Sequence, residues 1–169
     1  QGILSAWPAA YADGMIYFGS FDGNLYCLDA ASGKVKWIFR GSSPLMAPIV
    51  WNRNVYVGSY DYNIYCLDAA NGNIRWKFST KGFAGTGKLD AADGILYAGS
   101  FDNNIYALDA NTGRILWKFP TNGFVTAVCI DQGRIYAGSW DCHLYCLEAQ
   151  TGKLIWKFKT SLGTPSQIE

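Results

Sequence analysis

Carboxylates recur at regular intervals along the chain and are the first residues that could hold a metal or transfer protons. One set follows the aromatic residue after each Gly-Ser pair and comprises Asp22, Asp61, Asp102 and Asp141. A second set precedes an alanine in a later turn and comprises Asp29, Asp68, Asp109 and Glu148. A turn Asp commonly accepts hydrogen bonds from its own backbone, and a residue present in every copy of a repeat most simply serves the fold. We therefore expect structural roles for both sets and assign no catalytic residue.

Cys142, His143 and Cys146 are close in sequence and are residue types that bind zinc. If the segment is a strand, the two thiols lie about 13 Å apart and His143 points to the opposite face. Zinc–sulfur bonds are about 2.3 Å long, so these side chains converge on one ion only if a bulge intervenes. Cys146 also occupies the repeat position of Cys27 and Cys66, which favours a small buried packing residue. No metal site is predicted.

Two further groups of residues could contact a partner. Lysines follow a tryptophan in three copies, at Lys77, Lys118 and Lys157. They could form a basic band for an anionic partner, but charged residues that protect an exposed sheet edge are the favoured interpretation. Residues without counterparts in the other copies are candidates for surface loops that carry function. They are Trp51, Arg53, Tyr62, Lys88 and His143.

The elements that position these residues form an internal repeat. Four Gly-Ser pairs, which begin at positions 19, 58, 99 and 138, recur at steps of 39, 41 and 39 residues, and four tryptophans recur at the same steps. A period of about 40 residues is typical of stacked or radial repeat proteins. Each copy contains short apolar runs rich in Val, Ile, Tyr and Trp, which indicates strands rather than helices. In the second copy we predict strands over residues 46–50, 55–58, 64–67 and 74–78.

These strands are apolar on both faces, as in the run Leu-Tyr-Cys-Leu at 25–28. Each small sheet must therefore be covered on both sides by its neighbours. The sequence predicts an all-β chain, a β-propeller of four-stranded antiparallel blades arranged around an axis. We expect a single domain over residues 1–169, with blades at about 1–40, 41–80, 81–121 and 122–160. Residues 161–169 are interpreted as the start of a further blade strand.

The repeat resembles the tryptophan-docking motif of pyrroloquinoline-quinone (PQQ)-type propellers, Ala-x-Asp-x-x-Thr-Gly-Lys-x-x-Trp. The segments CLDAASGKVKW at 27–37 and ALDANTGRILW at 107–117 carry it, and all four copies retain its Gly and Trp. The resemblance implies that each Trp docks between blades near the Gly of a neighbouring motif. The docking residues so implied are Trp37, Trp76, Trp117, Trp156, Gly33, Gly72, Gly113 and Gly152. The Gly-His and Trp-Asp pairs of WD40 blades are missing, since Trp140-Asp141 lies at a different hairpin.

Four blades are fewer than a propeller of this family needs to close. PQQ-type propellers generally close with seven or eight blades, so the chain is expected to form half of such a ring. Its end blades would then expose apolar faces, which mark interaction surfaces. Two alternatives stay open: a second copy completes the ring, or further repeats of a longer chain do so.

Charge and cysteine content restrict the class of partner. Fourteen basic and thirteen acidic residues give a formal charge of +1, which favours neither nucleic acid nor an acidic membrane. No apolar run approaches the roughly 18 residues that a membrane-spanning helix needs. Five cysteines are an odd number, which argues against a disulfide framework, and no signal peptide is visible. These features favour a cytoplasmic location, with a trimmed extracytoplasmic domain as the alternative.

Two functions are compatible with these patterns. The favoured one is a non-catalytic propeller that acts as a protein-binding scaffold or sensor module, with no cofactor. The alternative is a fragment of a PQQ-dependent alcohol or sugar dehydrogenase, for which the resemblance would imply PQQ, calcium and a catalytic Asp. Alcohol-oxidising members also carry adjacent cysteines, and this chain has no such pair.

Overall fold

The computed structural model describes residues 7–85 and 87–160 as four antiparallel sheets of four strands each. The first blade contains β1 (Ala10–Ala12), β2 (Met15–Gly19), β3 (Asn24–Asp29) and β4 (Val35–Arg40). The second contains β5 (Ile49–Trp51), β6 (Asn54–Gly58), β7 (Asn63–Asp68) and β8 (Ile74–Ser79). The third contains β9 (Asp90–Ala92), β10 (Ile95–Ser100), β11 (Asn104–Asp109) and β12 (Ile115–Pro120). The fourth contains β13 (Val125–Asp131), β14 (Arg134–Ser139), β15 (His143–Glu148) and β16 (Leu154–Lys159).

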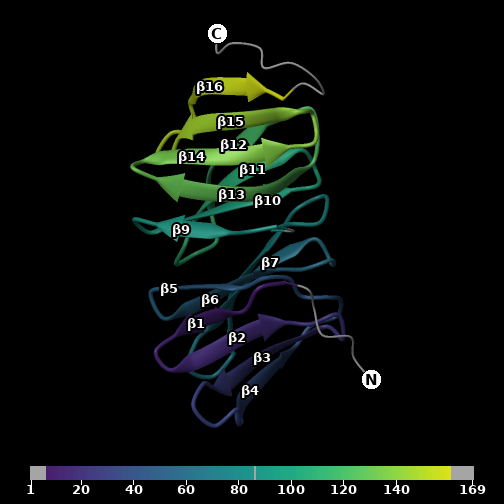
Figure 1. The fold of residues 1–169 in the computed structure, drawn as a ribbon, viewed down its shortest axis with the longest axis vertical. Helices are drawn as coiled ribbons and strands as arrows, with labels where there is room; N and C mark the ends of the chain where they lie inside the picture. Colours follow the sequence, from purple (N-terminus) through teal and green to yellow (C-terminus); the bar gives the residue numbers. More distant parts are fainter. Residues whose placement is uncertain (1–6, 86, 161–169) are drawn as a thin grey trace.

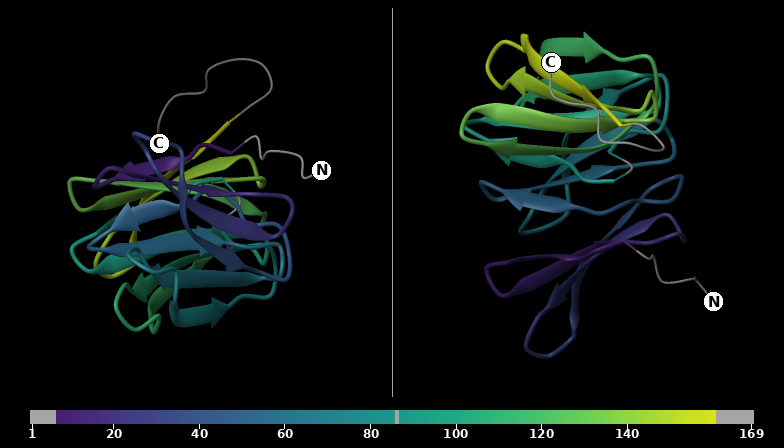
Figure 2. Two further views of the ribbon diagram at one scale, coloured as in Figure 1. Left: turned by 90° about the horizontal axis from the view of Figure 1, so that it is seen from below. Right: turned by 45° about the horizontal axis from the view of Figure 1, so that its top comes forward.

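The four blades follow one another in chain order, from the purple β1–β4 to the yellow β16 (Figure 1). The sheets are layered face to face, with the N-terminal blade at one end and the C-terminal blade at the other (Figure 2). The first strands lie on the inner side, where β1 contacts β5 and β9 contacts β13. The fourth strand forms the opposite edge of every sheet. This is the predicted all-β propeller arrangement, and the described residues form no closed ring.

Apolar side chains of neighbouring blades fill the space between the sheets. Tyr17, Leu25 and Cys27 of the first blade share one cluster with Val55 and Leu67 of the second. Equivalent clusters join the second blade to the third and the third to the fourth. The strands are therefore apolar on both faces because each sheet is buried from two sides.

A bulge in the last hairpin of each blade sets the position of its tryptophan. In the first blade Cys27 pairs with Trp37 but Leu28 pairs with Val35, so Lys36 is the extra residue. The same shift recurs in the other three blades. The preceding turn ends in a glycine with a φ of 67° to 75°, a conformation that favours a residue without Cβ.

The first strand of the second blade differs from the prediction. We predicted residues 46–50, whereas β5 spans Ile49–Trp51. Leu45 forms only an isolated bridge to Ser59, and Met46 N donates to Gly58 O at 3.0 Å. Pro48 lacks an N–H group, so the ladder cannot continue through it.

Two predictions concern the end of the chain and membrane-spanning helices. The predicted start of a further blade at 161–169 lies outside the described residues. Within the described part of the chain, no helix has the length and apolar character needed to cross a membrane.

Candidate functional site: docking junctions and an aromatic rim

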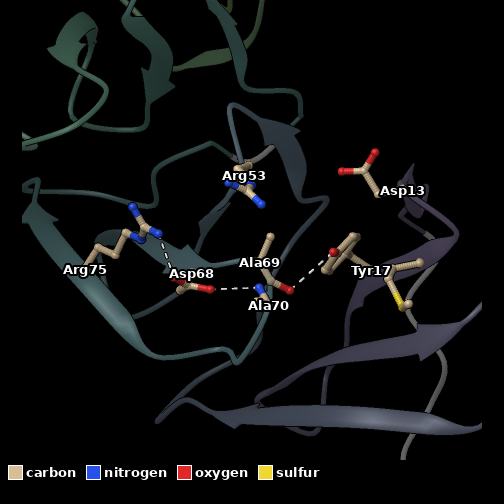
Figure 3. Close-up of a pocket in the computed structure, with 8 residues that line it drawn as sticks. Asp13, Tyr17, Arg53, Asp68, Ala69, Ala70 and Arg75 are labelled. Carbon is tan, nitrogen blue, oxygen red and sulfur yellow. Dashed lines mark hydrogen bonds and ion pairs between the residues drawn. The ribbon is translucent and has the colours of Figure 1, made fainter.

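The junction between the first two blades centres on one backbone carbonyl. Trp37 Nε1 donates a hydrogen bond to Ala69 O at 3.0 Å, and the Tyr17 hydroxyl donates to the same oxygen at 3.4 Å. The Trp37 ring covers Gly72, where a Cβ atom would lie 2.6 Å from ring atom Cε3. Figure 3 shows Tyr17 pointing across the junction towards Ala69, while Arg75 holds Asp68 beside it. Two donors of one blade therefore converge on one acceptor of the next.

The next two junctions repeat this geometry. Trp76 Nε1 and the Tyr56 hydroxyl both donate to Ala110 O, each at 3.0 Å. Trp117 Nε1 donates to Ala149 O at 2.8 Å. Tyr97 donates to that oxygen at 3.2 Å. The rings of Trp76 and Trp117 cover Gly113 and Gly152 as Trp37 covers Gly72.

Burial keeps the junction tyrosines in the form that donates. It raises the pKa of Tyr17 to about 12, with a further contribution from the nearby Cys27. Burial also raises the pKa of Tyr97 to about 12, and it raises the pKa of Tyr56 as well. The three hydroxyls therefore remain protonated at neutral pH.

The fourth blade holds the same donor pair without an acceptor among the described residues. Tyr136 and Trp156 have ring centroids 6.0 Å apart at an interplanar angle of 49°, compared with 5.8 Å and 48° for Tyr17 and Trp37. At Gly138 an added Cβ would meet nothing within 4 Å, whereas at Gly58 it would lie 1.9 Å from Ala84 O. This face of the fourth blade is therefore built like the others, and no residue in the described part of the chain packs on it.

The first blade presents the matching acceptor side. Ala30 is the counterpart of Ala69, and no described residue donates to its carbonyl. Gly33 is the counterpart of Gly72, and a Cβ added there would meet nothing within 4 Å. Residues 7–85 and 87–160 thus form three filled junctions, one donor face that no described residue covers and one acceptor face that no described residue covers.

The recurring carboxylates are used inside their own blades. Asp61 accepts from the Tyr65 hydroxyl at 2.6 Å and from the backbone of Asn63 at 3.1 Å. Burial by itself would raise the pKa of Asp61, but hydrogen bonds from Tyr65, Ser59 and neighbouring groups outweigh it and lower the pKa. Equivalent Tyr–Asp bonds occur at Asp22, Asp102 and Asp141.

The second acidic set closes the last hairpin of each blade. Asp29 and Asp109 accept hydrogen bonds from Ser32 and Thr112, respectively. Asp68 pairs with Arg75 at 2.6 Å, and Glu148 accepts from Thr151. These acids therefore stabilise turns.

The Cys-His-Cys segment does not converge. Cys142 is exposed in a turn, Cys146 is buried in β15, and His143 Nδ1 lies 2.9 Å from Asp141 O. Across residues 7–85 and 87–160, no three His, Cys, Asp or Glu side chains gather closely enough to hold a metal ion. Burial raises the pKa of Cys66 to about 12, so that thiol is an uncharged packing group.

The other candidates occupy varied positions. The three lysines after the tryptophans are exposed on the outer strands β8, β12 and β16. Trp51 packs against the cluster between the second and third blades. Lys88 pairs through its backbone with β13, since Val128 N donates to Lys88 O at 3.2 Å. This extra link between the third and fourth blades was not predicted.

One pocket of about 440 Å³ opens between the first two blades. Arg53, Arg75, Asp13 and Asp68 line it, together with the docking carbonyl residue Ala69 (Figure 3). The two positive and two negative side chains give it no net preference for one charge.

A row of aromatic rings runs along one rim of the blades. Six of its members occupy the β2–β3 type turns and the connections between blades. Trp7, which precedes β1, contacts both Phe21 and Tyr60, and from Tyr60 onward each ring contacts the next. We call this row the aromatic rim; it comprises Trp7, Phe21, Tyr60, Phe83, Phe101, Phe124 and Trp140. Ring centroids lie 4.5 Å apart for Tyr60–Phe83 and 4.6 Å for Phe101–Phe124. Trp140 is 66% exposed, so the row ends in an exposed indole side chain.

The aromatic rim was not predicted, although the sequence contains a signal for it. An aromatic residue follows each of the four repeated Gly-Ser pairs, at Phe21, Tyr60, Phe101 and Trp140. Two connections add a Gly-Phe pair, at Phe83 and Phe124. Only the stacking of blades brings these positions together.

Solved structures with this fold include proteins about twice as long as the chain. BamB from Moraxella catarrhalis matches with a TM-score of 0.78 and 22% identity, over 91% of this chain and 53% of that one. The computationally designed Ika8 protein matches with a TM-score of 0.81 and 19% identity, over 89% of this chain and 48% of that one. The designed Ika4 protein matches with a TM-score of 0.77 and 18% identity, over 85% of this chain and 92% of that one.

Sequence comparison assigns the family over nearly the whole length. No curated protein sequence matches the chain significantly. The family described as outer membrane protein assembly factor BamB matches it twice, over residues 1–85 and 63–168. The two overlapping matches contain all four copies of the motif, and the repeat, the blades and the tryptophan junctions agree with them. The chain belongs to this BamB-like family of PQQ-repeat propellers.

Proposed function

We propose that the chain is a non-catalytic scaffold that binds another protein through the aromatic rim. The observation that carries the proposal is the continuous row of rings across all four blades, with Phe21, Phe124 and Trp140 exposed. Exposed aromatic side chains of this size provide most of the binding energy in many protein interfaces. The recurring acids accept hydrogen bonds within their own blades, and Cys27, Cys66 and Cys146 are buried, which supports a binding role rather than catalysis.

The rigid position of the rim also supports a binding role. The rim residues lie at turns and connections that are fixed by blade packing. For example, Lys81 N donates to Asp102 Oδ2 at 3.0 Å next to Phe83. A preorganised surface loses little conformational entropy on binding. Apolar side chains of a peptide or of a protein loop are the partner chemistry that suits such a row.

A peptide-display selection tests this function. We expect the immobilised chain to select peptides rich in apolar side chains. Their affinity should fall at least about tenfold when Phe124 and Trp140 are both changed to serine, because aromatic anchors dominate such interfaces. The measurement is fluorescence anisotropy with the selected peptides.

The control is Tyr11→Ser, which removes an exposed aromatic ring of β1 outside the rim. Peptides that bind the rim variant and the wild-type chain equally would contradict the proposal. Saturable one-to-one binding of PQQ in the presence of calcium would contradict the non-catalytic role.

A further inference from the structure

The two ends of the chain are complementary to each other. The open face of the fourth blade carries the donors Tyr136 and Trp156 in the geometry of a filled junction. The open face of the first blade carries the acceptor Ala30 and the uncovered Gly33. A partner that fills both faces must therefore present an acceptor face and a donor face of the same type.

Apolar residues around the open donors match those that the filled junctions bury. In the second and third blades, Ile64 and Ile105 occupy one position of the third strand and are 0% exposed. Their counterpart Leu144 is 37% exposed, and the neighbouring Phe158 is 36% exposed. The fourth blade thus holds an apolar face whose equivalents all pack on a following blade.

The outer face of the first blade also has apolar residues that no neighbouring blade covers. Val55, Val57 and Leu67 of the second blade are fully buried against the first blade. Their counterparts on the first blade are only partly buried, and this set comprises Ile16, Phe18 and Leu28. A blade placed against this face would bury them as the first blade buries the second.

We propose that a second copy of this chain closes the ring, with Trp156 Nε1 and the Tyr136 hydroxyl of each copy donating to Ala30 O of the other. One copy presents both required faces, so two copies form two identical junctions and leave neither face open. The matches cover 53% of the solved BamB chain and 48% of the Ika8 chain. Two matched segments of this size together span about one such chain. The match to Ika4 covers 92% of that protein, so four blades constitute nearly an entire solved chain.

The contact is heterologous, because different surfaces of the two copies meet. Such contacts give a closed ring only when the rotation between copies returns to the start, and open filaments otherwise. The proposal therefore predicts a species of two chains that does not grow at higher concentration. The donors and the acceptor of this closure, Trp156, Tyr136 and Ala30, do not belong to the aromatic rim.

Light scattering coupled to size exclusion tests the proposal on the chain of residues 1–169. The wild-type chain is expected to elute with twice the mass of one chain. Trp156→Ala should weaken the dimer by about 100-fold or more, because it removes a buried aromatic anchor from both junctions. Leu116→Ala is the control and should leave the dimer intact, since Leu116 is 49% exposed on the outer strand β12 of the third blade, which is already covered on both faces.

A second variant acts on the acceptor face. Gly33 has a φ of 67°, and asparagine tolerates this conformation. In a single chain the new Cβ meets nothing within 4 Å, but in a filled junction it would lie as close to the indole as the 2.6 Å found at Gly72. Gly33→Asn should therefore give a folded monomer, as judged by an unchanged circular dichroism spectrum.

Mixing the two variants provides a test of complementarity. Trp156→Ala retains its acceptor face and Gly33→Asn retains its donor face, so the mixture can form one intact junction and should recover a two-chain species. A wild-type chain that is monomeric at all concentrations would overturn the proposal and leave the open faces to further repeats of a longer chain. A dimer that both variants leave intact, or growth into long polymers, would also overturn it. Failure of peptide binding at the rim would not alter these masses, so the two proposals fail separately.

Discussion

Replacing Trp76 by alanine is expected to lower the free energy of unfolding by about 3–5 kcal/mol, the usual cost of removing a large buried aromatic side chain. The Trp76 side chain is only 9% exposed, covers Gly113, and donates to Ala110 O across a blade junction. The substitution leaves a cavity between two sheets and removes one of the two donors to that carbonyl. Urea denaturation followed by circular dichroism measures the change.

The matched control is Trp140→Ala, because Trp140 is 66% exposed and does not donate to a junction carbonyl. Surface substitutions usually change stability by less than about 0.5 kcal/mol, and the ring contacts of Trp140 raise this expectation to no more than about 1 kcal/mol. Equal losses for the two variants would contradict a junction role for Trp76.

Gly58→Ala is expected to destabilise the chain by about 1–3 kcal/mol or more, because it forces a methyl group into a filled space. The added Cβ would lie 1.9 Å from Ala84 O, and a backbone carbonyl cannot rotate away as a side chain can. Neither Gly58 nor its counterpart Gly138 has a positive φ, so backbone strain does not complicate the comparison.

Gly138→Ala is the position-matched control. Nothing lies within 4 Å of a Cβ added there, and Gly→Ala at a compatible site stabilises by about 0.4–1 kcal/mol. Both variants are measured by urea denaturation at a protein concentration low enough for the chain to be single. A Gly138→Ala chain as unstable as Gly58→Ala would show that this face of the fourth blade is covered in the single chain, which would contradict an open donor face.

The repeat was predictable from sequence because two markers, Gly-Ser and Trp, keep one register along the chain. The predicted strands of the second copy agree with β6, β7 and β8 to within one residue at each end. The first strand was wrong because Pro48 interrupts the ladder while Leu45 and Met46 still contact the end of the second strand. Periodicity alone does not report a missing hydrogen-bond donor.

The sequence did not predict that a tryptophan and a tyrosine donate to the same carbonyl oxygen at each junction. Trp37 lies 32 positions before its acceptor Ala69, and Tyr17 lies 52 positions before it. Their convergence depends on the twist and spacing of two separate sheets, which a one-dimensional pattern does not contain. The aromatic rim was missed for the same reason, although the aromatic residue after each Gly-Ser pair was visible.

The central claim is that three indoles donate to junction carbonyls and that Trp156 donates in the same way to a second copy. Hydrogen exchange of the seven tryptophan indole N–H groups tests this claim most directly. Hydrogen exchange is measured by NMR on the wild-type chain and on Gly33→Asn. We predict that Trp37, Trp76 and Trp117 exchange at least about tenfold more slowly than Trp140 in both proteins, because docked groups exchange only on opening. Trp156 should exchange slowly in the wild-type dimer and rapidly in the Gly33→Asn monomer. Rapid exchange at Trp76, or equal exchange of Trp156 in the two proteins, would contradict this claim.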